Sequence, residues 1–90
     1  MYLEIISPEK VLFKGQVASV TVPGANGEFQ MLNNHAAILS TLTEGIVKFV
    51  ITHPLEAEYD TLTAEGNNYS LKIKGGVVEM NDNKVIILPS

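Results

Sequence analysis

The sequence predicts an all-β fold, specifically a roughly ten-stranded antiparallel β-sandwich of two sheets with no C-terminal helical domain. Two observations lead to this fold class. Apolar and polar residues alternate along several short segments, which is the period-two pattern of half-buried strands. Turn-forming residues recur at short intervals, which leaves little room for helices. The chain has 90 residues, enough for a single hydrophobic core, so we expect one domain covering residues 1–90.

Four segments show the strand alternation clearly: residues 2–7, 17–22, 46–52 and 69–74. In each segment every second residue is apolar, and those residues should face the core. The inward-facing sets predicted in this way are Leu3 and Ile5; Ala18, Val20 and Val22; Val47, Phe49 and Ile51; and Tyr69, Leu71 and Ile73.

Residues 35–42, with the sequence HAAILSTL, are compatible with two structures. Ala36, Leu39 and Leu42 fit a helical stripe, but the threonines near the end of the segment favour a strand and Gly45 stops it early. We therefore predict a strand here.

The closing sequence GGVVEMNDNKVIILPS predicts a hairpin. Its turn should be Asn81-Asp82-Asn83, because asparagine and aspartate tolerate the left-handed backbone of a tight turn.

The net charge and the type of cationic residue limit the classes of partner that the chain can bind. The net charge is −4, and all six cationic residues are lysines. Nucleic-acid binding relies on positive patches and on the guanidinium group of arginine, so we expect no nucleic-acid partner. The acids Glu56, Glu58 and Asp60 alternate, which places them on one side of a predicted strand as a solvated face that protects a sheet edge.

The absence of cysteine excludes disulfides, thiolate zinc sites and cysteine nucleophiles. The first residues, MYLEIISPEK, lack the basic start and long apolar stretch of a secretory signal. We therefore expect a protein kept in a cytosol-like compartment.

The polar stretch PGANGEFQMLNNHA, residues 23–36, contains the candidate chemistry. His35 as a base and Glu28 as an acid would be seven residues apart, and no nearby serine, cysteine or second carboxylate completes a catalytic set. His35 and His53 lack further ligands at metal-site spacing, and the glycines do not form a phosphate-binding motif. We expect no catalytic, cofactor-binding or metal-binding residues, and instead two turns that flank a short strand.

A protein-docking function is consistent with these exclusions. Phe29 and Met31 are candidates for exposed apolar side chains in the polar stretch, and such side chains favour contacts with another protein. A free-standing β-sandwich adaptor that binds protein or carbohydrate is the alternative, although the chain has no tryptophan and only three tyrosines to stack on sugars.

Ordered sequence pieces resemble the β-sandwich domain of the F-type ATP synthase epsilon subunit, called delta in mitochondria. Residues 3–49 contain a first strand ending in Ser-Pro, the motif Pro-Gly-x-x-Gly-Glu-Phe at 23–29, and His-Ala followed by leucines and a glycine. The closing hairpin at 75–90 also looks like that of the family, so the resemblance covers nearly the whole chain.

The resemblance implies a non-catalytic subunit of the central rotor stalk, without a cofactor, that binds the gamma subunit and the ring of c subunits. Ion-driven rotation would thereby be coupled to ATP synthesis or hydrolysis. It places Gly27, Glu28 and Phe29 against the c ring, and Ser7 and His35 on the side turned to gamma. It also implies a peripheral location on the cytoplasmic face of the bacterial inner membrane, with membrane contact only through the rest of the complex.

Two features depart from the family pattern. Asn33-Asn34 and Ala37 stand where the family commonly has Pro-Gly before the histidine and a proline two residues after it. Asparagine can replace glycine in a left-handed turn, so we expect the turn to persist. The sequence also ends before the inhibitory C-terminal helix pair that many members carry. As a complete chain it would resemble the short form of the subunit, which cannot inhibit through these helices. As a domain cut from a longer chain it would imply nothing about inhibition.

Overall fold

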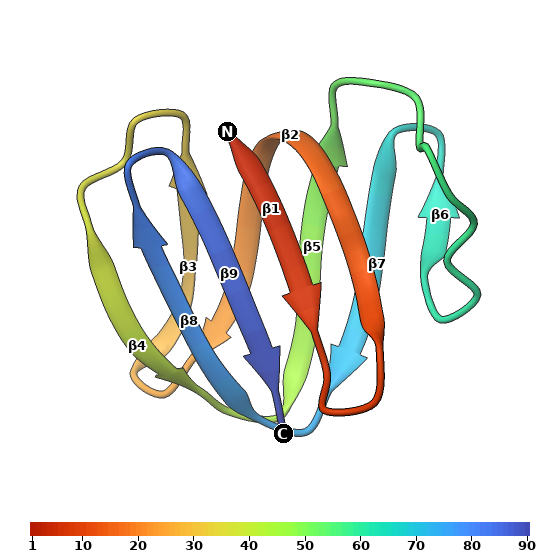
Figure 1. Ribbon diagram of the computed structural model, residues 1–90. Coiled ribbons are helices and arrows are strands. Elements are labelled where there is room, and N and C mark those ends of the chain that lie inside the picture. Colours follow the sequence, from red (N-terminus) through yellow and green to blue (C-terminus); the bar gives the residue numbers. More distant parts are fainter.

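The computed structural model describes residues 1–90 and contains nine strands and no helix (Figure 1). The strands are β1 (Tyr2–Ile6), β2 (Val11–Gly24), β3 (Gly27–Leu32), β4 (Ile38–Leu42), β5 (Gly45–Ile51), β6 (Thr63–Glu65), β7 (Asn68–Ile73), β8 (Gly76–Asn81) and β9 (Lys84–Pro89). The all-β prediction is confirmed. The structure has no helix with the length and hydropathy needed to cross a bilayer.

The strands form two layers that share the long strand β2 (Figure 1). What we call the first sheet has the order β4-β8-β9-β1 and continues into the first half of β2. The second sheet contains β3, the second half of β2, β5, β7 and β6. The two halves of β2 explain why nine strands build the roughly ten-stranded sandwich that we predicted. One part of the prediction is wrong: β1 and β9 run parallel, so the hydrogen-bonded network is mixed.

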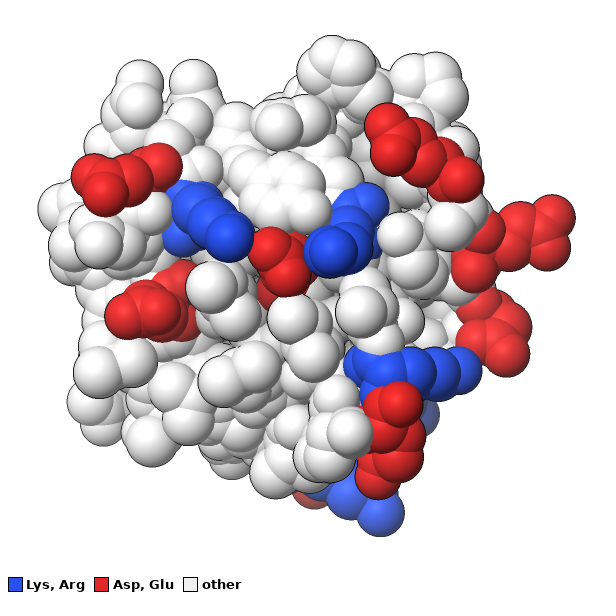
Figure 2. All heavy atoms as spheres, viewed as in Figure 1, with Lys and Arg blue, Asp and Glu red and all other residues white.

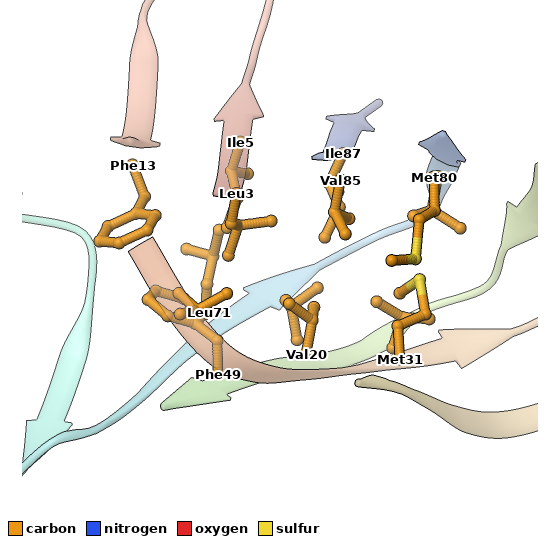
Figure 3. Packing of buried hydrophobic residues seen from close by; sticks show 14 of the residues in the cluster. Leu3, Ile5, Phe13, Val20, Met31, Phe49, Leu71, Met80, Val85 and Ile87 are labelled. Atoms are coloured by element: carbon orange, nitrogen blue, oxygen red, sulfur yellow. The ribbon is translucent and has the colours of Figure 1, made fainter. Parts of the chain in front are cut away.

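The core lies between the two layers and contains 17 buried apolar residues. At one side Phe13 packs against Phe49 with ring centroids 4.4 Å apart. At the other side the side chains of Met31 and Met80 point toward each other (Figure 3). These residues form one continuous cluster that both layers share.

Most residues that were predicted to face inward do so, with one exception. Val20 and Val22 are fully buried, but Ala18 is exposed and Val17 is buried in its place. The pairing of β2 with β5 shifts register between Val17 and Ser19. An irregularity of this kind inserts an extra residue, which reverses the in-out alternation on one side of it.

The two other strand predictions are confirmed. Residues 38–42 form β4, which pairs with β8 along its whole length. The closing residues form the β8–β9 hairpin, and its turn residues Asp82 and Asn83 have φ values of 51° and 60°. These values are the left-handed backbone that the asparagine- and aspartate-rich turn predicted.

The acids Glu56, Glu58 and Asp60 do not lie on a strand, so that prediction is wrong. They belong to the irregular connection between β5 and β6. The residue between the last two of them, Tyr59, packs against the core with its ring centroid 5.5 Å from that of Phe13. The acidic residues alternate with other residues here because one side of the loop packs against the core. A loop of this kind can show the same sequence pattern as a strand.

Candidate protein-docking surfaces

The polar stretch at residues 23–36 forms two turns that flank β3, as predicted. The first turn joins β2 to β3, and Gly27 at its end has a φ of 122°, a conformation that favours glycine. The second turn follows β3 at Asn33-Asn34, where Asn34 has a φ of 63°. Asparagine therefore supplies the left-handed residue that the sequence led us to expect.

Glu28 lies at the beginning of β3 on the outer face of the second sheet. Its carboxylate Oε2 is 3.7 Å from Nζ of Lys48 on β5, and both side chains remain more than half exposed. The side chain is therefore available at the surface, with a single intramolecular cation beside it.

Phe29 and Met31 are not exposed, so they do not provide the apolar docking surface that the sequence suggested. Phe29 is half-buried and packs against the core, and Met31 is 0% exposed. Phe29 therefore anchors the β2–β3 hairpin to the core and does not extend from the surface.

His35 is exposed in the connection between β3 and β4. Its Nδ1 is 2.7 Å from the carbonyl oxygen of Ala36, and its backbone N–H donates to the carbonyl of Leu32 at 3.0 Å. His35 and Glu28 belong to opposite ends of β3, so the structure does not assemble them into an acid–base pair. The other histidine, His53, hydrogen-bonds Thr52 in a different connection, and no group of three metal-ligating side chains occurs.

Ser7 closes the turn between β1 and β2. Its hydroxyl donates to the carbonyl of Lys10 at 3.1 Å and accepts from the backbone N–H of Lys10 at 3.2 Å. The β1–β2 and β2–β3 connections lie at one end of the molecule together with the C-terminus, and the β3–β4 connection lies at the opposite end near the N-terminus (Figure 1). Ser7 and His35 are thus far apart, one following β1 and the other preceding β4.

On strands β4, β8 and β9 the first sheet exposes an apolar surface that the sequence reasoning missed. We call it the apolar face, and its most exposed members are Leu39 at 72%, Leu88 at 50% and Val77 at 37%. Val77 pairs directly with Leu88 across β8 and β9, and Leu39 lies on the neighbouring strand β4. Glu79 pairs directly with Leu39 and is exposed on β8, so one carboxylate lies between the apolar side chains of β4 and β9. Figure 2 shows charged side chains over the upper part of these strands and a largely uncharged area below them.

A sequence signal for the apolar face was present. Residues 85–88, VIIL, are apolar at every position, whereas a strand with one solvated face should alternate. Val85 and Ile87 fill the core, which leaves Ile86 and Leu88 pointing outward. A continuous apolar run in a half-buried strand therefore marks an outer surface that suits a partner.

Charged residues border the apolar face on β1 and at the beginning of β9. Nζ of Lys84 is 3.1 Å from Oε1 of Glu4 and 5.7 Å from the ring centroid of Tyr2. Glu4 is the neighbour of Ile86 across the β1–β9 pairing. The row Leu39, Glu79, Ile86 and Glu4 therefore alternates between apolar and acidic residues, whereas the neighbouring pair of Val77 and Leu88 is apolar.

The outer face of the second sheet has a different character. A row of directly paired residues crosses it and is polar throughout: Gln30, Thr21, Lys48, Ser70 and Thr63. The exposed apolar residues of this sheet, Leu32 and Ile46, lie outside that row. The two outer faces therefore differ, because the first sheet has a directly paired apolar couple, Val77 and Leu88, where the second has a polar row.

A third ion pair lies at the irregular connection, where Nζ of Lys10 is 3.1 Å from Oδ1 of Asp60. The hydrogen bond from Lys10 and its positive charge hold the pKa of the Asp60 carboxyl below its usual range. Asp60 is fully exposed, so solvent screening keeps this pair weak.

Comparison with known protein families shows one match over the full length. The model of the ATP synthase delta/epsilon chain β-sandwich domain matches residues 1–90. The chain is 38% identical over 86 residues to the ATP synthase epsilon chain of Leptospira interrogans, covering 96% of this chain and 58% of that relative. It is 35% identical to the ATP synthase epsilon chain of Chlorobium limicola, covering 96% of this chain and 84% of that relative.

Two solved structures share the fold. One is from the central stalk and c-ring structure of the Tetrahymena thermophila mitochondrial ATP synthase, with a TM-score of 0.72, 20% identity, and coverage of 99% of this chain and 62% of that one. The other is from the Euglena gracilis mitochondrial ATP synthase structure of OSCP, F1 and the c-ring, with a TM-score of 0.72, 26% identity, and coverage of 97% and 48%.

Proposed function

The chain belongs to the family of ATP synthase delta/epsilon chain β-sandwich domains, and on that premise we propose that it acts as a non-catalytic part of the central stalk. It would bind the gamma subunit and the c ring and help couple ion-driven rotation to ATP synthesis or hydrolysis. The single observation that carries this proposal beyond family membership is the apolar face, whose side chains Leu39, Val77 and Leu88 are exposed on the first sheet.

The position of the apolar face supports gamma as its partner. Family resemblance assigns Ser7 and His35 to the gamma side, and these residues follow β1 and precede β4. The sheet order β1-β9-β8-β4 places β8 and β9 between them, so the exposed Val77 and Leu88 lie between the two expected contact points. One docked partner could therefore cover the whole surface from the β1–β2 turn to the β3–β4 connection.

The β2–β3 hairpin supports the c ring as a second partner. Gly27 and Glu28 lie at one end of the sandwich, and Phe29 fastens the hairpin to the core behind them. A hairpin anchored in this way presents the Glu28 carboxylate on a rigid support. By this assignment Glu28 makes the polar contact, Gly27 provides the turn, and Phe29 keeps the turn in place.

A stalk component must transmit torque, and a close-packed sandwich is suited to that task because well-packed interiors have low compressibility. We place this chain peripherally on the cytoplasmic face of a bacterial inner membrane, where it would contact the membrane only through its complex. Both curated relatives described above are bacterial, which supports that placement.

Co-expression with the gamma subunit tests the proposal directly. A stable complex should copurify, and a chain that stays monomeric in the presence of gamma would contradict the assignment.

Ring attachment is tested separately with Glu28→Lys in the assembled enzyme. We expect this change to weaken attachment of the stalk to the ring, because it reverses a charge at the proposed contact. Glu65→Lys is the matched control, since this exposed acid lies on β6 and leads into the β6–β7 turn at the other end of the molecule (Figure 1). Equal effects of the two changes, or glycan binding without ring binding, would favour the adaptor alternative.

A further inference from the structure

We propose that Asn83, acting with Asn33 and Asn34, is a positioning residue that holds the His35 connection in the conformation that docks. This inference rests on the proposed function, in which that connection contacts gamma. The three asparagines form what we call the amide clasp, which joins the β3–β4 connection to the β8–β9 turn.

Two hydrogen bonds make the clasp. The backbone N–H of Asn34 donates to Oδ1 of Asn83 at 2.7 Å, and Nδ2 of Asn83 donates to Oδ1 of Asn33 at 2.9 Å. Oδ1 of Asn33 also accepts from the α-ammonium group of Met1 at 3.0 Å. Both groups of the Asn83 amide are therefore used, and residues about fifty positions apart in sequence are connected.

The β8–β9 turn is the fixed side of the clasp. Asn81 and Lys84 close the ladder on either side of it, and the carbonyl of Asn83 accepts the backbone N–H of Tyr2 at 3.1 Å. The turn is thus held by its own hairpin and by the neighbouring strand β1. The backbone position from which the Asn83 side chain extends is therefore fixed.

The β3–β4 connection is the side that needs support. All residues from Asn33 to Ala37 are exposed, so burial does not fix their conformation. Apart from the strand ladders, the connection makes one backbone hydrogen bond, from His35 to Leu32. Segments with exposed residues and few internal bonds open easily. The clasp adds hydrogen bonds directly before His35 and therefore limits the conformations available to it.

A preordered connection should dock more tightly, because binding then costs less conformational entropy. The two asparagines thus have a double role in this chain, since Asn34 supplies the left-handed residue of the turn and both supply the groups that attach it.

The first test measures order in the isolated chain. Asn83→Gly removes the clasp side chain but keeps the left-handed backbone, because glycine adopts a φ of 60° without strain. We expect amide hydrogen exchange of Asn34 to accelerate roughly 3- to 10-fold, the factor expected for losing one or two exposed hydrogen bonds. Asp82→Gly is the matched control, because it changes the adjacent left-handed residue, whose side chain makes no hydrogen bond.

The second test measures docking on gamma. Asn83→Gly should weaken gamma binding, and the loss should shrink when His35→Ala is already present, because the clasp acts through the connection that contains His35. Asn83→Asp keeps the acceptor for the Asn34 N–H and should restore part of the affinity. A general loss of stability would instead reduce binding equally in both backgrounds.

The outcomes separate the clasp from the proposed function. Equal exchange at Asn34 in Asn83→Gly and Asp82→Gly overturns the clasp itself. Faster exchange with unchanged gamma affinity overturns its positioning role. Failure of the unmodified chain to bind gamma contradicts the proposed function and, with it, the positioning role; the exchange data then report only whether the clasp exists.

Discussion

Replacing Leu39 by threonine should separate binding from folding. Leu39 is 72% exposed on the apolar face, and threonine suits an exposed strand position. Complete burial of a leucine side chain contributes about 1.5–3 kcal/mol, so docking of a partner on the exposed share of Leu39 contributes roughly 1–2 kcal/mol. Leu39→Thr should therefore lower gamma affinity about 5- to 30-fold. The free energy of unfolding should change by no more than about 0.5 kcal/mol, because the side chain is already in water.

The assay is titration calorimetry of purified gamma with each variant, together with urea unfolding of each variant alone. Ile46→Thr is the matched control, because Ile46 is 40% exposed but lies on β5 in the second sheet, away from the apolar face and from the His35 connection. It also replaces an exposed aliphatic side chain by threonine and should leave gamma affinity unchanged.

Two results would refute this reasoning. Equal losses of affinity in Leu39→Thr and Ile46→Thr would show that the apolar face has no special part in binding. A large loss of stability in Leu39→Thr would show that this side chain belongs to the core, so a change in affinity could not be assigned to contact with a partner.

Three further predictions concern the fold. Met80→Ala should lower the free energy of unfolding by about 2–5 kcal/mol in urea titrations, because it leaves a cavity at a fully buried position. Gly76→Ala should destabilise the β8–β9 hairpin by at least about 1–3 kcal/mol, because Gly76 has a φ of 143° and a Cβ there would meet the carbonyl oxygen of Leu88. The carboxyl of Asp60 should titrate below its ordinary pKa in NMR, and Lys10→Met should raise that pKa toward the ordinary value.

The sign of the pH effect follows from the lowered pKa. A carboxyl with a lower pKa in the folded chain than in the unfolded chain adds stability above the unfolded pKa, and this is lost as pH falls through the folded pKa. The effect should be small and should decrease with added salt, because Asp60 is fully exposed. An unchanged Asp60 titration in Lys10→Met would contradict the ion pair. Wild-type stability in Met80→Ala or Gly76→Ala would contradict the described packing or turn.

Much of the fold could be predicted because alternation and turn chemistry act locally. The strands around Leu3, Phe49 and Leu71 follow from period-two spacing, and the left-handed residues Asn34 and Asn83 follow from side chains that tolerate this backbone. These features depend on neighbouring residues only, so a single sequence is enough to find them.

The remaining features depend on contacts between distant residues. The exposure of Ala18 follows from a register shift against β5, which the sequence of β2 alone does not indicate. Met31 alternates correctly with its neighbours, but whether it meets solvent or Met80 depends on which sheet covers it. The clasp between Asn34 and Asn83 joins two turns that are adjacent only after folding.

The continuous strand β2 has a mechanical consequence. It begins beside the β1–β2 turn, crosses from one layer to the other, and ends at the hairpin that leads to Glu28. A force applied at that hairpin is therefore carried to the first sheet along covalent bonds, and the two layers cannot slide past each other without bending this strand. If two partners hold the molecule at these two places, β2 is the continuous covalent connection between them, and its irregularity near Ala18 lies where the strand passes from β1 to β5.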